Sequence, residues 1–278
     1  MTRRSRPVLA AASLASEVIG PAEAPAVLLL HGFMGSRGDW AAVGAALAKT
    51  RRCILVDLPG HGATGDPADQ ALWTPDGCVG ALARILASAG GGAVVGYSLG
   101  GRLALQLAVE HPGIVGRGVV ISGTPGVAGD CGRAQRRNSD EGLARRLEQR
   151  GLDAFLEDWY GRPLFAALRE HPGFPAVLKR RRRNDPHLLA RSLRSMGTGV
   201  QRSLWGELPG TSTPLLFLAG ERDTKFTDIA FDAVARCPKG EAVVVRGRGH
   251  ALVEEDPQAV TREVDGFLTH QPGAASPA

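Results

Sequence analysis

The sequence has no long apolar run. None of its apolar segments approaches the roughly 20 consecutive residues needed to cross a bilayer, so we expect no membrane insertion. The basic residues 1–6 followed by the apolar segment 8–14 faintly resemble a secretion signal. The apolar part is short, however, and Ser13, Ser16 and Glu17 interrupt it. We therefore expect one or two short edge strands within residues 8–19.

Cysteine is scarce as well. The chain has four, Cys53, Cys78, Cys131 and Cys237; none forms a C-x-x-C pair, and no histidine clusters with them. This spacing argues against a zinc site or a redox pair and is typical of a protein from a reducing compartment. We expect no bound metal and a cytoplasmic location.

Positive charge is concentrated in one part of the chain. Residues 123–208 hold sixteen Lys plus Arg against ten Asp plus Glu, a net +6, whereas the whole chain carries +5. Nearly all of these cations are arginine, which suits bidentate recognition of carboxylates. Nucleic acid is the other partner that such a balance can indicate. Aromatic residues are not interleaved with the arginine run 180–183, so we favour a small anionic substrate and no nucleic acid.

Apolar runs alternate with segments of helical pattern along most of the 278 residues. The runs predict buried strands at 26–30, 53–57, 94–97, 118–123, 213–220 and 241–245, and the alternation predicts an α/β fold with a doubly wound, mostly parallel sheet. The pattern breaks between about residues 124 and 208, where only helical segments are expected. We therefore predict a core made of residues 1–123 and 209–270, a helical, arginine-rich cap at 124–208, and a disordered tail at 271–278.

A serine lies at the end of the central predicted strand. The stretch Gly96-Tyr97-Ser98-Leu99-Gly100 has the order G-x-S-x-G and is followed by a helix-forming run. A strand-to-helix turn this sharp needs glycine on both sides of the serine, because a Cβ there would meet neighbouring backbone. The turn presents the Ser98 hydroxyl above the sheet edge.

Two further polar residues follow predicted strands, Asp223 and His250. The carboxyl ends of parallel strands meet at one sheet edge, and the chain order Ser…Asp…His is that of the α/β-hydrolase fold. We expect His250 to take a proton from Ser98 while Asp223 holds the imidazole in one tautomer. Backbone N–H groups of Phe33 and Leu99 are predicted to form an oxyanion hole.

Two other histidines, His31 and His61, sit in the loops after the first two buried strands. Both occupy glycine-bearing turns, and His61 comes too early in the chain for the catalytic position. We interpret both as packing residues.

Several motifs resemble one family of α/β-hydrolase-fold enzymes over nearly the whole chain, from Val27 to Leu268. Residues 30–36, 56–62 and 95–102 carry motifs that are widespread among α/β-hydrolases. Residues 158–165, 192–201 and 220–226 are more specific and are similar to MenH, the 2-succinyl-6-hydroxy-2,4-cyclohexadiene-1-carboxylate synthases of menaquinone biosynthesis. Arg202 departs from the pattern, since many relatives have proline there.

The resemblance implies a lyase reaction, the 2,5-elimination of pyruvate from 2-succinyl-5-enolpyruvyl-6-hydroxy-3-cyclohexene-1-carboxylate. Ser98 then acts as a general base and not as an acylated nucleophile, and the substrate is a small polycarboxylate. No cofactor is implied. The family's substrate-binding residues correspond to Tyr97, Arg102, Arg133, Arg136, Trp159 and Arg181, the last being a choice among Arg180, Arg181, Arg182 and Arg183.

Two alternatives stay open at this point. The same triad serves hydrolases that act on an ester, thioester or C–C bond of an anionic substrate. A second alternative is an α/β-hydrolase scaffold that binds a ligand without catalysis. We expect a monomer or a weak homo-oligomer in either case.

Overall fold

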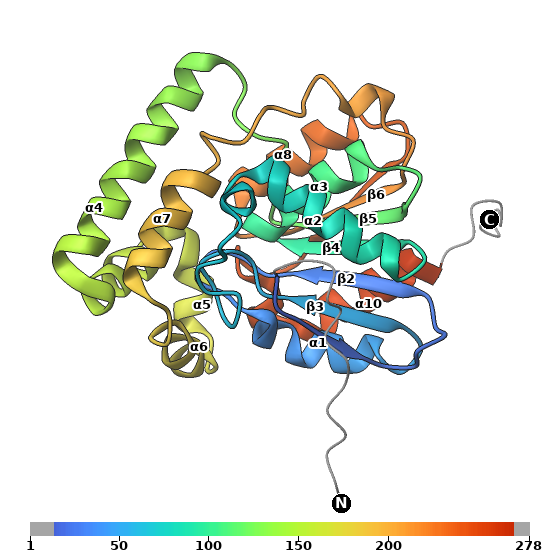
Figure 1. Cartoon of the computed structure of the whole chain (residues 1–278), viewed down its shortest axis with the longest axis horizontal. Coiled ribbons are helices and arrows are strands. Elements are labelled where there is room, and N and C mark those ends of the chain that lie inside the picture. The colour runs from blue at the N-terminus through green and yellow to red at the C-terminus, as the bar shows by residue number, and fades with distance from the viewer. Residues whose placement is uncertain (1–13, 270–278) are drawn as a thin grey trace, which may run out of the picture.

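A computed structural model describes residues 14–269, and its centre is a seven-stranded sheet (Figure 1). The strand order is β1-β3-β2-β4-β5-β6-β7, with β1 antiparallel to β3 and all other neighbours parallel. The strands are β1 (Ser16–Ile19), β2 (Ala26–Leu30), β3 (Arg52–Val56), β4 (Gly92–Tyr97), β5 (Val115–Ile121), β6 (Leu215–Gly220) and β7 (Gly240–Val245). The predicted doubly wound, mostly parallel sheet is confirmed.

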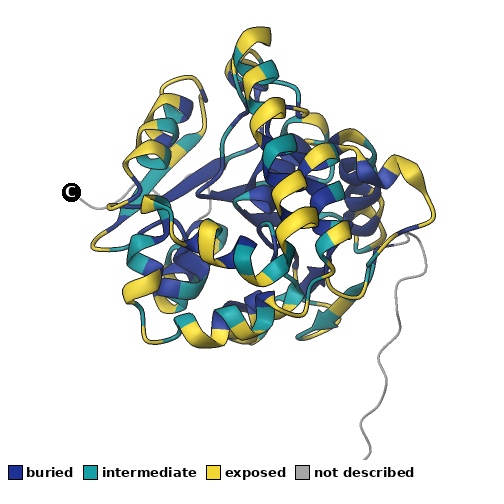
Figure 2. Ribbon diagram, turned by 90° about the vertical axis from the view of Figure 1, so that its left-hand side faces the viewer, coloured by how far each residue is buried: buried dark blue, intermediate teal, exposed yellow. Residues whose placement is uncertain are grey.

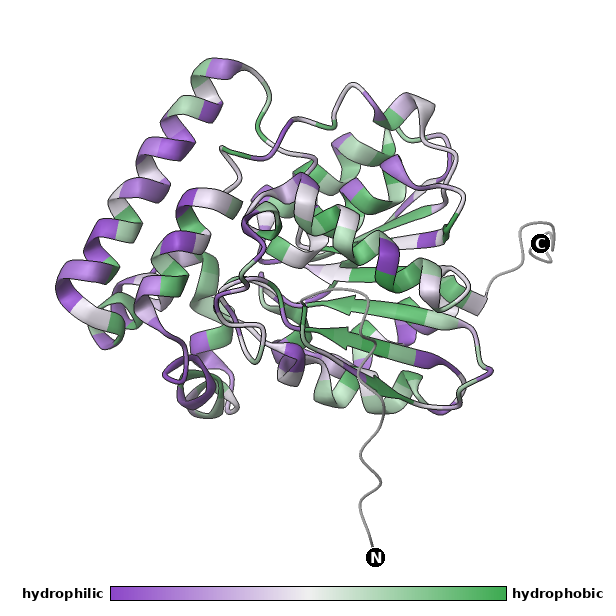
Figure 3. Cartoon of the chain, viewed as in Figure 1, coloured by the Kyte–Doolittle hydropathy of each residue, from purple (hydrophilic) through white to green (hydrophobic). Residues whose placement is uncertain are grey.

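Alternate residues of the central strands enter two separate apolar cores, one on each face of the sheet. Leu29 and Val95 belong to one core and Leu28 and Val94 to the other, and all four are fully buried. Figure 2 shows the strands as buried elements between helices with exposed outer sides, and Figure 3 shows the same strands as strongly hydrophobic. Burial on both faces explains why the strands read as continuous apolar runs.

Helices cover both faces of the sheet (Figure 1). One face packs against α1 (Ala41–Leu47) and α10 (Pro257–Thr269), the other against α2 (Pro75–Ser88), α3 (Leu99–Glu110) and α8 (Thr224–Val234). Short helical turns complete the core at η1 (Arg37–Trp40), η2 (Gln70–Trp73), η4 (Leu208–Gly210) and α9 (Leu252–Glu255). Within residues 14–269, no helix combines the length and apolar character that crossing a bilayer requires.

One local prediction needs correction. The run 241–245 is not a fully buried strand, because β7 is an edge strand with β6 as its partner and is partly exposed. The loop after β3 contains η2, whose first turn is capped by the Asp69 side chain. Helix α8 begins at Thr224, directly after Asp223. Residues 8–13 and the predicted tail at 271–278 lie outside the described part of the chain.

Residues 124–208, hereafter the cap segment, are all described and contain helices but no strand. The helices are α4 (Asp130–Tyr160), η3 (Pro163–Phe165), α5 (Ala166–Glu170), α6 (Phe174–Arg181) and α7 (Pro186–Met196). Figure 1 shows α4 to α7 together beside the carboxyl ends of the strands, and Figure 3 shows α4 as largely hydrophilic. The positive φ of Gly151 divides α4 into two helical stretches. This segment therefore consists of helices and the loops between them.

The passage from β4 into α3 brings two backbone segments unusually close. A Cβ atom on Gly96 would lie 2.1 Å from the carbonyl oxygen of Gly100, and one on Gly100 would lie 2.2 Å from the carbonyl oxygen of Leu30. Backbone atoms cannot rotate away as a side chain can. Glycine at both positions therefore permits the turn that carries Ser98.

We expect Gly96→Ala to destabilise the protein by about 1–3 kcal/mol, because the new methyl group overpacks against fixed backbone. Thermal unfolding should show a clearly lower Tm. The matched control is Gly116→Ala on β5, where a Cβ would make only an ordinary 3.7 Å contact with the carbonyl oxygen of Gly92. Equal Tm values for the two variants would contradict the proposed role of the close backbone approach.

Candidate active site

Ser98 occupies the turn between β4 and α3. Its backbone has φ 51° and ψ −107°, a conformation that non-glycine residues rarely adopt and that is characteristic of functional positions. The turn is fixed from both sides, because Ser98 N–H donates to the carbonyl of Ile121 and Gly100 N–H donates to that of His31. The half-buried serine side chain is therefore held at the N-terminus of α3, where the helix dipole favours negative charge.

His250 and Asp223 complete a hydrogen-bonded series with Ser98. The His250 Nε2 atom lies 3.3 Å from Ser98 Oγ, and its Nδ1 atom lies 2.7 Å from Asp223 Oδ2. Asp223 follows β6 and His250 follows β7, and both side chains are buried. An aspartate that accepts from Nδ1–H leaves the Nε2 lone pair facing the serine. This arrangement can draw a proton from the Ser98 hydroxyl.

The imidazole of His250 is also enclosed by aromatic rings. Its centroid lies 4.6 Å from that of Phe226, 5.7 Å from that of Tyr97 and 5.8 Å from that of Phe165. Phe165 comes from the cap segment, so both parts of the chain restrict the orientation of this ring.

Two backbone N–H groups near Ser98 have no acceptor among residues 14–269. Leu99 is the first residue of α3, and its N–H has no intrahelical partner by the geometry of a helix start. Within the described residues, neither Phe33 N–H nor Leu99 N–H donates a hydrogen bond. Both residues line the cavity over Ser98.

His31 and His61 shape the loop that carries Phe33. His31 Nε2 accepts from Leu58 N–H, and His61 Nε2 accepts from Met34 N–H. Each Nδ1 donates to a nearby carbonyl, that of Gly32 or Pro59. Burial lowers the pKa of both imidazoles, that of His61 to about 3 with a further contribution from His31. Neither lines the cavity over Ser98, so the contacts agree with packing roles.

A cavity of about 280 Å³ opens over Ser98 between the core and the cap segment. Of the residues predicted from the sequence, it is lined by Phe33, Tyr97, Ser98, Leu99, Arg102, Arg136, Trp159, Arg181 and His250. Asp223 lies behind His250 and does not line it. The structure does not bring Arg133 to this cavity; its guanidinium pairs with Asp130 one turn earlier in α4.

Arg181 is the member of the arginine run that reaches the cavity; Arg180, Arg182 and Arg183 do not line it. Its buried guanidinium donates to Asp39 Oδ1 at 2.8 Å, to Glu254 Oε1 at 3.0 Å and to the Tyr160 hydroxyl at 3.2 Å.

The two carboxylates that hold Arg181 come from the core. Burial alone would raise the pKa of Asp39, but Arg181 holds it below its usual range. Arg180 pairs with the same two acids, Asp39 and Glu254. These ion pairs connect α6 to η1 and to α9. Helix α9 begins two residues after His250.

The other two arginines of the set are held by neighbouring polar groups. Arg102 donates to Gln201 Oε1 at 2.7 Å and to the carbonyl of Met196 at 2.8 Å. Burial, then the nearby Arg136, lowers the pKa of Arg102 to about 9, which still leaves it charged at neutral pH. Arg136 donates through Nε to Asp140 Oδ1 at 2.8 Å. Arg202 pairs with Glu207 and Glu110, away from the cavity.

The polar lining residues that were not identified from the sequence include Ser122, Arg162, Ser192 and Glu254. The hydroxyls of Ser122 and Ser192 are buried and have no hydrogen-bond partner in the described part of the chain. Ser122 follows β5 with φ 47°, and its place at a strand's carboxyl end was the signal that could have identified it. No comparable signal distinguishes Arg162 from other arginines of the cap segment.

Comparison with known proteins agrees with this geometry. Residues 27–263 match the model of the alpha/beta hydrolase family. The 2-succinyl-6-hydroxy-2,4-cyclohexadiene-1-carboxylate synthase of Escherichia coli O1:K1 is 34% identical over 246 residues, covering 88% of this chain and 94% of that protein. The PHYLLO protein of Arabidopsis thaliana chloroplasts is 32% identical over 265 residues, covering 89% of this chain but 16% of that much longer protein.

A solved structure is also similar over nearly its full length. The structure of MenH from S. aureus superposes with a TM-score of 0.85 at 29% identity, covering 91% of this chain and 97% of that one. The similarity to these relatives, in fold and in sequence, thus extends over both the core and the cap segment.

The buried, neutral His61 predicts a pH-dependent stability. Its folded-state pKa is about 3, whereas the unfolded chain binds a proton near pH 6.5, so the unfolded state is favoured as pH falls below 6.5. One such group costs up to about 1.4 kcal/mol of unfolding free energy per pH unit in this range. His61→Asn should therefore show a shallower loss of stability between pH 6.5 and 4.5 than the unaltered protein.

Urea unfolding at a series of pH values measures this slope. His111→Asn, which changes a half-buried histidine outside the site, provides the control. Identical slopes for His61→Asn and the unaltered protein would contradict the assignment of a neutral His61.

Proposed function

The chain belongs to the alpha/beta hydrolase family and, within it, to the 2-succinyl-6-hydroxy-2,4-cyclohexadiene-1-carboxylate synthases, and from this membership we infer that it is a lyase of menaquinone biosynthesis. The reaction eliminates pyruvate from 2-succinyl-5-enolpyruvyl-6-hydroxy-3-cyclohexene-1-carboxylate. The observation that carries the inference is the placement of Ser98, hydrogen-bonded to His250, on the floor of a cavity lined by four arginines.

In the proposed mechanism Ser98 is the base and not a nucleophile. The Ser98 proton moves toward His250 Nε2 as the serine oxygen takes the ring proton α to the succinyl carbonyl, and Asp223 stabilises the resulting imidazolium. The electron pair of the broken C–H bond moves onto the carbonyl oxygen. Collapse of this enolate then forms a double bond between ring carbons 2 and 3, the existing 3,4 double bond shifts to carbons 4 and 5, and the C–O bond from carbon 5 to the enolpyruvyl group breaks. The expelled enolpyruvate takes up a proton and becomes pyruvate.

The unpaired N–H groups of Phe33 and Leu99 are proposed to hold the enolate oxygen. Donors aimed at developing negative charge in an enclosed site lower the barrier without reorganising during the reaction. The absence of any acceptor for these two groups within residues 14–269 supports the assignment.

Substrate carboxylates are proposed to bind Arg102, Arg136 and Arg181, while Tyr97 and Trp159 flank the ring. Arg133 is the weakest member of the predicted set, because it pairs with Asp130 outside the cavity. The chemistry needs a base and charge stabilisation, so we propose neither a metal nor an organic cofactor. We further propose that the enzyme acts in the cytoplasm, as a monomer or weak homo-oligomer, on this small polycarboxylate alone.

Turnover of enzymatically generated 2-succinyl-5-enolpyruvyl-6-hydroxy-3-cyclohexene-1-carboxylate tests the proposal. Diene absorbance and pyruvate release should rise together in the unaltered protein. Ser98→Ala should lower kcat by about 10²–10⁴-fold, the usual contribution of a positioned base. Ser88→Ala, at the end of α2, removes a hydroxyl that bonds only the carbonyl of Ile85 and should leave the rate unchanged.

Two outcomes would overturn the assignment. No turnover together with rapid, Ser98-dependent hydrolysis of simple esters would show a hydrolase. Binding of the substrate without release of either product would show a non-catalytic scaffold.

A further inference from the structure

Arg162 lies at the junction of α4 and η3 and lines the cavity over Ser98. Its guanidinium carbon sits 4.4 Å from the ring centroid of Trp159, three residues earlier. The side chain is half-buried. Stacking of a planar cation on an indole ring restricts its rotation and fixes the direction of its donors.

This guanidinium has no hydrogen-bond or carboxylate partner within residues 14–269. Other arginines of the cap segment contrast with it, since Arg145 pairs with Glu141, Arg182 with Asp153 and Arg194 with Glu148. An arginine that is half-buried without a hydrogen-bond or ion-pair partner carries a desolvation cost that stacking on a ring and more distant carboxylates offset only in part.

Other positive charges surround Arg162. A second, open cavity of about 530 Å³ shares Arg136 and Arg162 with the first, and its other charged lining residues are Arg146 and Asp140. Burial, followed by repulsion from Arg146 and Arg136, lowers the pKa of Arg162, and the attraction of Asp158 and Asp140 is smaller. A bound anion would relieve both the burial cost and the repulsion.

Arg136 adds donors to the same place. Its Nε atom is occupied by Asp140, but its two terminal nitrogens have no partner in the described chain. The mouth shared by the two cavities therefore presents unoccupied donors from two guanidinium groups. Arg102 and Arg181, deeper in the cavity, already donate to two and three protein groups respectively.

We propose that Arg162 is a further substrate-binding residue, which receives one carboxylate of the substrate at the mouth of the Ser98 cavity with the help of Arg136. This inference rests on the proposed function for the identity of the substrate. A carboxylate there would accept bidentate, charge-assisted hydrogen bonds from the stacked Arg162 fork. The residue would thus select substrates with a carboxylate distant from the reacting ring carbon.

The test compares steady-state kinetics of Arg162→Gln with those of the unaltered enzyme. Loss of a hydrogen bond to a charged group should raise KM about 10- to 100-fold, with a much smaller effect on kcat, because Arg162 is not part of the proton relay. Arg162→Lys should fall between the two, since it keeps the charge but loses the planar fork. Arg162→Met, which keeps an unbranched apolar side chain against Trp159, gives a second uncharged variant should Arg162→Gln fail to fold.

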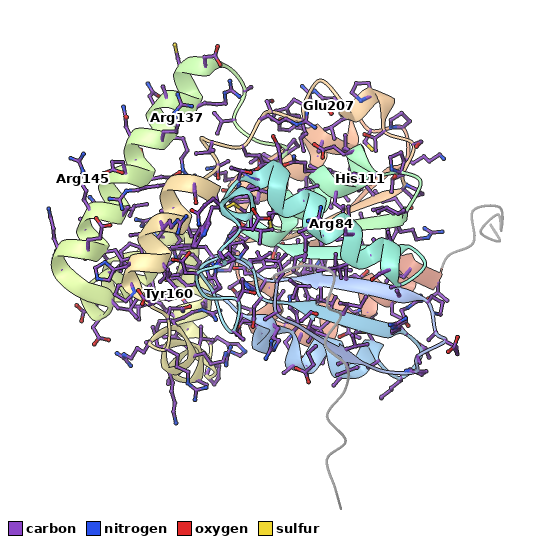
Figure 4. The ribbon with its side chains drawn as sticks, viewed as in Figure 1. Arg84, His111, Arg137, Arg145, Tyr160 and Glu207 are labelled. Carbon is purple, nitrogen blue, oxygen red and sulfur yellow. The ribbon has the colours of Figure 1, made fainter. Side chains whose placement is uncertain are left out.

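The control removes an equal charge from another position of the cap segment. Arg145 on α4 pairs with Glu141, lines neither cavity and lies on the outer side of the helix (Figure 4). Arg145→Gln should leave KM unchanged. A KM of the uncharged Arg162 variants equal to that of Arg145→Gln would overturn the proposal.

Binding of citrate, a tricarboxylate, provides a readout that does not depend on turnover. Isothermal titration should show weaker citrate binding to Arg162→Gln than to Arg145→Gln. Weaker binding in a protein that fails to turn over the cyclohexene substrate would retain the anion site and reject the proposed function. Normal turnover with unchanged KM and unchanged citrate binding would reject the anion site at Arg162 and retain the proposed function.

Discussion

The first turn of α3 lies so close to the backbone of β4 and to the end of β2 that neither Gly96 nor Gly100 has room for a Cβ atom, and the site is built around these two contacts. The same turn meets the loop that carries Phe33, because Gly100 N–H donates to the carbonyl of His31 at the start of that loop. Backbone contacts therefore hold the Ser98 turn and the start of the Phe33 loop together.

Charge, in contrast, determines how the cap segment sits on the core. Arg181 is buried, and removing one of its acidic partners would leave a buried charge uncompensated. Its partners Asp39 and Glu254 belong to the core elements η1 and α9. Phe165 of the cap segment also contacts the ring of His250. Cap and core thus meet through a few specific groups close to His250.

Sequence reasoning reached the fold because the fold depends on local order in the chain, and it named three residues that the structure joins in one hydrogen-bonded series. Continuous apolar runs revealed strands buried on both faces, and Ser98, Asp223 and His250 each follow one strand. The edge position of β7 was missed, since it does not depend on local composition alone. The roles of the site residues remain predictions that kinetics must test.

It was harder to predict from the sequence which arginines of the cap segment face the cavity, for a physical reason. Consecutive residues of a helix point about 100° apart, so one of four adjacent arginines at the end of α6 faces the cavity, and the direction depends on how the helix packs. Arg181 could be named only through the family resemblance. The partners Asp39 and Glu254 are far away in sequence, and the isolation of Arg162 becomes visible only when every nearby acid has been placed.

The burial of the Arg181 network separates the cap's arginines into two groups by their response to ionic strength. Arg181 and Asp39 are each about 5% exposed or less at their side chains, so dissolved ions cannot reach between them. Arg145 and Arg182 are exposed to solvent, and the attraction between each of them and its acidic partner weakens as salt is added. The attachment of α6 to the core should consequently persist in concentrated salt. The long-range attraction between the basic surface and an approaching polyanion should weaken in the same solution. Substrate should therefore bind more slowly before the structure of the site is disturbed.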